Sequence, residues 1–216
     1  MTREALIVGA AAVPGAEEFY ARILRDADIV IACDAAGEWC LSLGRRPDLV
    51  VGDFDSACPG ARERLEARGI PVRAYPVEKD ASDLDIALTH ARDMGAARVC
   101  FTGAFSGRLD HTLAALGTLQ LAEDMAPRIL EPGFRAWLLS GRTRPSIEFS
   151  VDSEATISVL ALEASHGVTV TGMKYPLRGA SVGVLSSLGI SNTATGPVAG
   201  VSLITGTLLV IVSSDG

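Results

Sequence analysis

Acidic residues follow three apolar runs of this sequence, each where a strand would end. Asp53 and Asp55 come directly after one run, Asp83 follows the next, and Asp110 follows a third. If the chain stays extended after the first run, Asp53 and Asp55 point the same way and can face one ion. Two carboxylates about 4 Å apart repel by about 4 kcal/mol at an effective dielectric near 20, so gathering four without a cation is costly. The set predicts bound Mg²⁺, which takes a few carboxylates together with water and phosphate oxygens.

Basic and hydroxyl side chains accompany these acids. Lys79 and Arg108 offer positive charge to phosphate oxygens, and Ser82 is placed to cap a helix. His111 stands at another helix start, where we expect it to orient a neighbour rather than to act as a base. Each turn by itself is more often a plain helix start, and the Asp-x-Asp alone is more often an acidic turn capped by Ser56. Together the turns favour chemistry on a polyphosphate.

The elements that must position these residues are short apolar runs alternating with helical stretches. The runs cover residues 5–8, 29–33, 49–51, 72–75, 99–101 and 136–139. Most are continuously apolar, as expected for parallel strands covered on both faces. Residues 82–94 predict a helix with one apolar face, and residues 111–122 predict a helix packed well inside. This part therefore predicts an α/β domain with a mostly parallel sheet over residues 1–142.

The character of the chain changes near residue 145. Beyond it only seven residues are charged, and period-two alternation appears, as in residues 155–161. Gly and Ser punctuate these segments at short intervals. The pattern predicts a small all-β domain, a sandwich or part of a barrel, over residues 146–216.

Composition limits the classes of partner. The 216 residues carry a formal net charge of −7, and the sequence pI is about 5.0. Neither nucleic acid nor an anionic membrane is expected to bind such a chain, since both favour clustered Lys and Arg. No apolar run approaches the roughly 20 residues of a membrane span. Four cysteines without CxxC spacing indicate reduced thiols and a cytoplasmic protein.

The motifs together resemble those of thiamine pyrophosphokinases, in order and spacing and over nearly the whole chain. They lie at Asp34 and at residues 52–56 (GDFDS), 78–84 (EKDASDL), 107–111 (GRLDH), 172–177 (GMKYPL) and 189–192 (GISN). The resemblance implies transfer of pyrophosphate from ATP to the hydroxyl of thiamine by a homodimer, with Mg²⁺ as cofactor and thiamine near the subunit interface.

The resemblance also implies roles for individual residues. The magnesium and catalytic acids are Asp53, Asp55, Asp83 and Asp110, the nucleotide contacts are Asp34, Lys79, Ser82, Arg108 and His111, and the thiamine contacts are Ser191 and Asn192. The sequence departs from the family pattern at Ala35 and Ala36, where glycines are common, and at Ser106. These departures leave the acids untouched.

Two alternatives and one loop stay open. A pyrophosphokinase for another heterocyclic alcohol, such as a hydroxymethylpterin, would use the same acids, and a nucleotide-binding regulator without turnover would keep the same fold. The sequence has no Gly-x4-Gly-Lys-Ser/Thr motif, so it is not a P-loop kinase. The small residues of loop 9–15 fit either a phosphate contact or a plain connector.

Overall fold

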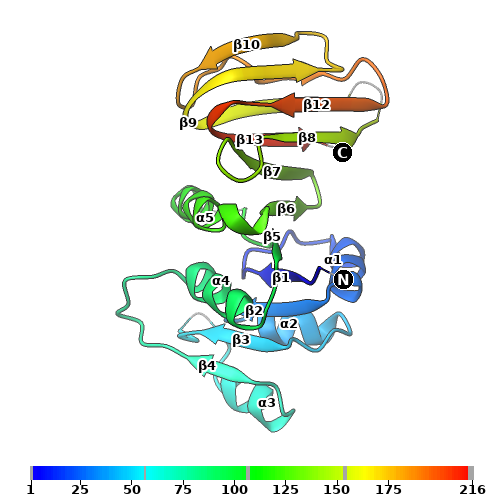
Figure 1. Ribbon diagram of the computed structural model, residues 1–216. Coiled ribbons are helices and arrows are strands. Elements are labelled where there is room, and N and C mark those ends of the chain that lie inside the picture. The colour runs from blue at the N-terminus through cyan, green and yellow to red at the C-terminus, as the bar shows by residue number, and fades with distance from the viewer. Residues whose placement is uncertain (1, 56, 106–107, 153–154, 214–216) are drawn as a thin grey trace. The chain divides into compact units, whose positions relative to one another are not determined.

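The computed structural model describes residues 2–55, 57–105, 108–152 and 155–213 (Figure 1). By packing, the chain divides into two compact units, Met1–Met125 and Ala126–Gly216. The first unit therefore ends before the boundary that the sequence predicts at residue 142. Ser56, Ser106 and Gly107, which belong to the motifs above, lie outside the described residues.

The described residues of the first unit include five parallel strands. They are β1 (Glu4–Val8), β2 (Ile29–Cys33), β3 (Leu49–Gly52), β4 (Val72–Ala74) and β5 (Arg98–Thr102). Their order is β4-β3-β2-β1-β5, and Ile7 of β1 lies between Ile31 of β2 and Phe101 of β5. These three side chains have no exposed surface, which confirms the double-sided burial predicted from the continuous apolar runs.

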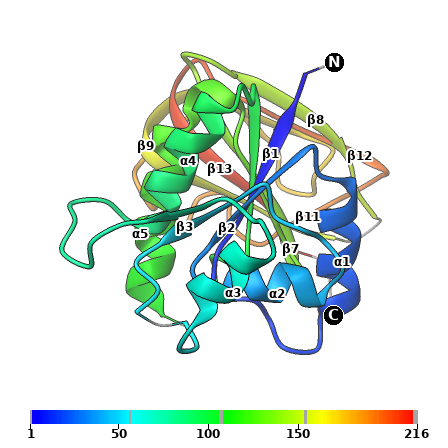
Figure 2. The same cartoon turned by 90° about the horizontal axis from the view of Figure 1, so that it is seen from below.

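In the part of the chain that the structure describes, five α-helices and a short 3₁₀ helix accompany these strands. They are α1 (Glu17–Asp26), α2 (Ala36–Ser42), α3 (Ala61–Ala67), α4 (Asp83–Asp93), α5 (Leu109–Leu121) and the 3₁₀ helix Glu123–Met125. Right-handed crossovers put α1, α2 and α3 on one face of the sheet and α4 on the other, beside α5 (Figure 2). Helix α4 confirms the prediction for residues 82–94, with Ser82 as its N-cap.

The second unit is antiparallel β-structure. Its strands are β6 (Arg128–Glu131), β7 (Phe134–Ser140), β8 (Ser146–Ser150), β9 (Thr156–Thr171), β10 (Leu177–Val182), β11 (Asn192–Thr193), β12 (Val198–Ser202) and β13 (Thr205–Ser213). The long strand β9 pairs with β13 along its first part and with β10 and β12 along its last part. Ile157, Val159 and Ala161 are buried between half-buried neighbours, which confirms the period-two prediction.

The run 136–139 shows where the sequence misleads. Taken as a strand of the α/β part, it is instead the centre of β7, which pairs antiparallel with β6 and β13. Ala136, Leu138 and Leu139 are buried, so the run is apolar for the same reason as a parallel strand. Burial on both faces hides the direction of pairing.

Candidate active site

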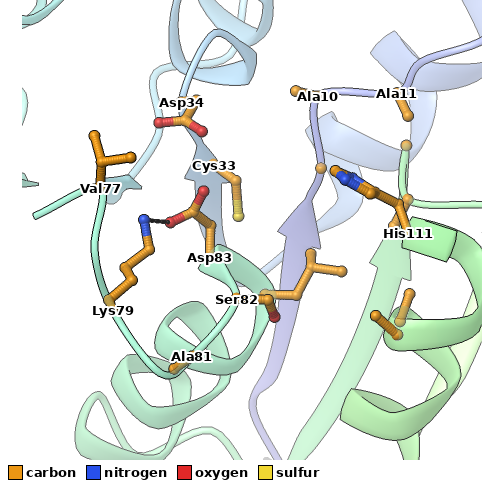
Figure 3. A pocket seen from close by; sticks show the side chains of 16 residues that line it. Ala10, Ala11, Cys33, Asp34, Val77, Lys79, Ala81, Ser82, Asp83 and His111 are labelled. Atoms are coloured by element: carbon orange, nitrogen blue, oxygen red, sulfur yellow. Dashed lines mark ion pairs between the residues drawn. The ribbon is translucent and has the colours of Figure 1, made fainter. Parts of the chain in front are cut away.

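A cavity of about 470 Å³ opens at the carboxyl ends of the parallel strands of the first unit (Figure 3). Connections on either side of the β1–β5 pair run to opposite faces of the sheet, and α/β sheets bind ligands at such a switch point. Gly9 follows β1 and Gly103 follows β5, and both line the cavity. A Cβ on Gly9 would lie 2.5 Å from the Gly103 carbonyl oxygen, so only glycine permits this close approach.

Asp34 stands at the end of β2 in a backbone conformation that few side chains adopt. Its φ is 47°, and its Oδ1 accepts a hydrogen bond of 2.9 Å from the Phe54 N–H. The carboxylate occupies space that a side chain at Gly52 would take, because a Cβ there would lie 2.6 Å from Asp34 Cγ. Gly52 itself has a φ of 150°. The end of β3 is therefore shaped to receive the carboxylate from the end of β2.

Three carboxylates converge beside this cavity. Asp34, Asp53 and Asp83 each offer an oxygen, and these oxygens lie within 4.8 Å of one another. Lys79 Nζ lies 2.5 Å from Asp53 Oδ2 and 3.1 Å from Asp83 Oδ1. Figure 3 shows Asp34 at the end of β2 facing Lys79 and Asp83, which come from the connection into α4. We call Asp34, Asp53 and Asp83 the carboxylate trio.

The charges of the trio act on one another. The pKa of Asp34 is raised to about 7, mainly by burial. The hydrogen bond from the Phe54 N–H opposes this rise, while the hydrogen bond to Asp83 and the charges of Asp83 and Asp53 add to it. The hydrogen bond from Lys79 holds the pKa of Asp53 below its ordinary value. Desolvation lowers the pKa of Lys79, but its ion pairs with Asp53 and Asp83 outweigh this and leave the pKa raised. One lysine thus compensates three carboxylates only in part.

The trio fits a divalent cation. Asp83 Oδ1 is buried and makes no hydrogen bond, although Lys79 is close enough for an ion pair. A buried carboxylate oxygen without a hydrogen bond is costly, and a hard cation with oxygen ligands would satisfy it. The donor set of carboxylates, with no histidine or thiolate among the three, suits Mg²⁺.

The comparisons with known proteins agree with this chemistry. The family described as "Thiamin pyrophosphokinase, catalytic domain" matches residues 20–129, and "Thiamin pyrophosphokinase, vitamin B1 binding domain" matches residues 146–208. The chain belongs to the thiamin pyrophosphokinase family. Neither the hydroxymethylpterin enzyme nor the silent regulator is favoured by these matches.

Individual relatives match over most of their length. The thiamine pyrophosphokinase of Bacillus subtilis is 28% identical over 191 residues, which are 86% of this chain and 87% of that protein. The crystal structure of a thiamine pyrophosphokinase from the same organism has a TM-score of 0.83 at 26% identity, covering 99% of this chain and 100% of that one. A thiamin pyrophosphokinase structure from Geobacillus thermodenitrificans has a TM-score of 0.81 at 28% identity, with coverages of 99% and 98%.

Two acids that the sequence assigned to the thiamin pyrophosphokinase site lie outside the trio. Asp55 is exposed, because Phe54 has a φ of 62° and the chain does not stay extended after Asp53. Asp110 is also exposed and pairs with Arg108 at 2.5 Å, which lowers the pKa of Asp110. Asp34, predicted as a nucleotide contact, takes the place beside Asp53 that was predicted for Asp55.

Other predicted contacts are near the cavity, with one change of role. Ser82 and His111 both line it. The Ser82 hydroxyl donates its single proton to Asp85 Oδ2 at 2.8 Å, so in this structure it is a capping group rather than a free donor. The sequence missed Cys33 as a wall residue, and burial raises the pKa of its thiol well above the ordinary value. The position of Cys33 at the end of a predicted strand could have indicated that it lines the cavity.

Loop 9–15 contributes to the cavity rather than serving only as a connector. Ala10 and Ala11 line it together with Gly9 (Figure 3). Small side chains at all three positions keep this part of the wall close to the backbone, although the N–H groups of Gly9 and Ala11 donate to the carbonyls of Thr102 and Gly103.

In the second unit, Ser191 and Asn192 have different surroundings. Ser191 is exposed, with a φ of 53°. Asn192 is 4% exposed, and its side chain bonds the backbone of Tyr175: Nδ2 donates to the carbonyl at 2.7 Å and Oδ1 accepts from the N–H at 2.9 Å. Oδ1 also accepts from the Thr193 N–H. Asn192 therefore holds the chain at Tyr175, and only Ser191 presents its side chain to solvent.

We expect Asn192→Ala to lower the free energy of unfolding by about 2–3 kcal/mol, because three hydrogen bonds worth about 1 kcal/mol each are lost. Ser191→Ala is the matched control: it should leave stability unchanged and raise the KM for thiamine about fivefold. Denaturant unfolding and steady-state kinetics measure the two effects. Equal stability of both variants would contradict the structural role of Asn192.

Proposed function

We propose that this chain transfers pyrophosphate from ATP to the hydroxyl of thiamine, giving thiamine diphosphate and AMP with Mg²⁺ as cofactor. The observation that supports it best is the carboxylate trio with Lys79 at the cavity on the switch point of the sheet. A polyphosphate with its cation needs both signs of charge at one place, and few other ligands do.

Asp34, Asp53 and Asp83 are the proposed ligands of the metal. When bound, Mg²⁺ supplies Lewis acidity and a template for phosphate oxygens. Phosphoryl-type transfer depends mainly on such positioning and charge neutralisation, with little covalent work for the protein.

The chain's own groups have separate tasks in this proposal. Lys79 places a fixed positive charge beside the phosphates, and the backbone at Gly9 and Ala10 lets them approach closely. The thiamine hydroxyl attacks the β-phosphorus of ATP, and AMP leaves. The hydroxyl loses its proton in this step, and the carboxylate of Asp34 or of Asp83, both in the cavity wall, accepts the proton. Arg108 and His111 are proposed as further nucleotide contacts. The first unit thus accounts for the ATP side of the reaction.

The second unit is proposed to bind thiamine and to form a homodimer. The match of residues 146–208 to a vitamin B1 binding domain supports the first role. Large apolar side chains on its surface support the second: they are Tyr175, Val184, Leu185, Leu188, Ile190, Val198 and Ile204. Exposed apolar surface of this kind favours contact between copies. Sedimentation equilibrium tests the dimer.

Nucleic acid and membrane are not among the proposed partners. Among the described residues, no helix is long and apolar enough to cross a membrane. The cytoplasm stays our proposed compartment, on the cysteine usage of the sequence.

The test of the reaction is incubation with ATP, MgCl₂ and thiamine, followed by identification of both products. AMP and thiamine diphosphate are expected in equal amounts, and EDTA in excess of the metal should stop their formation. ADP with thiamine monophosphate would overturn the proposal. Product from a hydroxymethylpterin but not from thiamine would favour the first alternative, and nucleotide binding without any product would favour the regulator.

Asp55 and Asp110 stay in the proposal as outer acids of the site. Both are exposed and apart from the trio, so screening weakens their action on the phosphates. We expect Asp55→Asn and Asp110→Asn each to lower kcat/KM about tenfold, roughly 1.4 kcal/mol of transition-state stabilisation. Losses of about a hundredfold or more would show that these acids join the trio when substrate binds.

A further inference from the structure

Asp85 lies in the first turn of α4 and is not among the side chains that line the cavity, yet its carboxylate joins two elements that do. Its Oδ2 accepts hydrogen bonds from the N–H of Ser82 at 3.0 Å and from its hydroxyl at 2.8 Å. Its Oδ1 accepts a bond of 2.6 Å from the hydroxyl of Thr118 in α5. One carboxylate therefore connects the start of α4 to α5.

The two connected elements both form part of the cavity wall. The start of α4 supplies Ser82 and Asp83, and α5 supplies His111 and Ala115. Thr118 follows Ala115 by three residues, so it lies on the same face of α5 one turn further on. Thr118 is 1% exposed, which fixes its hydroxyl between the two helices.

The bonds favour a carboxylate. In the structure the Ser82 N–H and hydroxyl donate to one oxygen of Asp85, and the Thr118 hydroxyl donates to the other. An asparagine that kept its oxygen on Ser82 would turn its NH₂ to Thr118, whose hydroxyl would then have to accept instead of donating and find another acceptor for its own proton. Bonds to an ionised acceptor are also about twice as strong as neutral ones.

We propose that Asp85 is a positioning residue for pyrophosphate transfer, holding Asp83 and the start of α4 at a fixed place against α5. This inference rests on the proposed function. The competing explanation is that Asp85 only caps α4, as its capping box with Ser82 would suffice to do. The bond to Thr118 separates the two explanations, because it plays no part in the cap.

The experiment compares four variants in steady-state kinetics and thermal unfolding. Thr118→Val keeps the shape of the side chain and the cap but removes the bond to Asp85; we expect kcat/KM for ATP to fall about tenfold, since small displacements of positioned groups cost this much or more. Asp85→Asn should lower kcat/KM for ATP about thirtyfold. Thr118→Ser, which keeps the hydroxyl, should stay within about twofold of the unaltered protein. Asp93 is an exposed acid at the other end of α4, so Asp93→Asn is the charge-matched control. Its kcat/KM should also stay within about twofold of the unaltered protein.

Wild-type kcat/KM in Thr118→Val, with only a lower unfolding temperature, would overturn the proposal and leave Asp85 as a cap. If Thr118→Val does not fold, Asp85→Glu decides: it keeps the charge but moves the carboxylate by one methylene, and wild-type kcat/KM there would equally overturn it. The affinity for Mg²⁺ and ATP without thiamine, measured by calorimetry, is independent of turnover. If no thiamine diphosphate forms, the proposed function fails, while about tenfold weaker binding by Thr118→Val but not by Thr118→Ser would still support the positioning role.

Discussion

Asp34→Asn is expected to raise the unfolding temperature of the metal-free protein while lowering pyrophosphate transfer by about a hundredfold or more. The trio gathers three carboxylates around one lysine, so removing one charge relieves repulsion. The substituted amide would keep the bond that Asp34 accepts from the Phe54 N–H and could donate to Asp83. In the proposed function, the acids of the trio destabilise the metal-free fold and serve as ligands when the cation is present.

The magnitudes follow from elementary electrostatics. Like charges about 4 Å apart cost about 4 kcal/mol at a dielectric near 20, and Lys79 offsets part of this, which leaves a gain of about 1–2 kcal/mol. For a chain of this length that is a rise of roughly 3–6 °C. The loss of transfer reflects about 3 kcal/mol of lost charge stabilisation in the transition state.

The pH dependence gives the stability effect a specific form. The folded-state pKa of Asp34, about 7, lies above its ordinary value of 3.8, so this group makes the metal-free protein less stable as pH rises between the two. The amide of the variant does not titrate. The difference in unfolding temperature should therefore be small near pH 4, grow up to pH 7 and stay level above it.

Differential scanning fluorimetry in EDTA from pH 4 to 9 measures the stability, and formation of AMP measures the transfer. Asp93→Asn changes the formal charge equally, away from the trio, and should show neither effect. A destabilised Asp34→Asn protein, or one with full turnover, would show that Asp34 is not part of a metal site.

The sequence predicted where carboxylates converge better than which carboxylates do so. Asp53 and Asp83 were found because acids after successive parallel strands must meet at one edge of the sheet. Asp34 follows β2 in the same way, so the same logic, applied to every strand, would have put it in the trio. Asp55 lies outside the trio because its predicted place beside Asp53 assumed an extended chain, and a positive φ at a residue such as Phe54 cannot be predicted from its type. Its role in the reaction stays a prediction.

Long-range contacts account for what the sequence did not show. The amide of Asn192 bonds the backbone of Tyr175, which only the folding of the second unit brings near, and its predicted contact with thiamine stays a prediction. The strands and helices of the α/β part were correctly predicted as far as α5, because they have distinct local patterns. The prediction that residues 111–122 pack well inside was wrong: Leu113 and Leu121 of α5 are exposed, because an apolar helix sequence does not show how much of its surface other elements cover. Strand β7 was assigned to the wrong sheet because an apolar run does not reveal its partners.

Gly52→Ala should be as damaging to catalysis as the loss of Asp34, although it changes no charge and no group with chemistry. The added methyl would overlap the Asp34 carboxylate, and a φ of 150° is strained for alanine. Asp34 must then leave the trio or β3 must shift. We expect kcat/KM to fall about a hundredfold or more, since an atom of the site is displaced by an ångström or so.

The stability of Gly52→Ala separates this mechanism from a simple loss of charge. Backbone strain of about 1–3 kcal/mol lowers the unfolding temperature by roughly 3–10 °C, opposite in sign to Asp34→Asn. Gly117→Ala is the matched control: Gly117 lies within α5, a Cβ there meets nothing within 4 Å, and alanine favours helix. That variant should gain stability and keep its activity within about twofold. If Gly52→Ala retained wild-type turnover, catalysis would not depend on the position of the Asp34 carboxylate beside β3. Asp34 would then not be part of the proposed metal site.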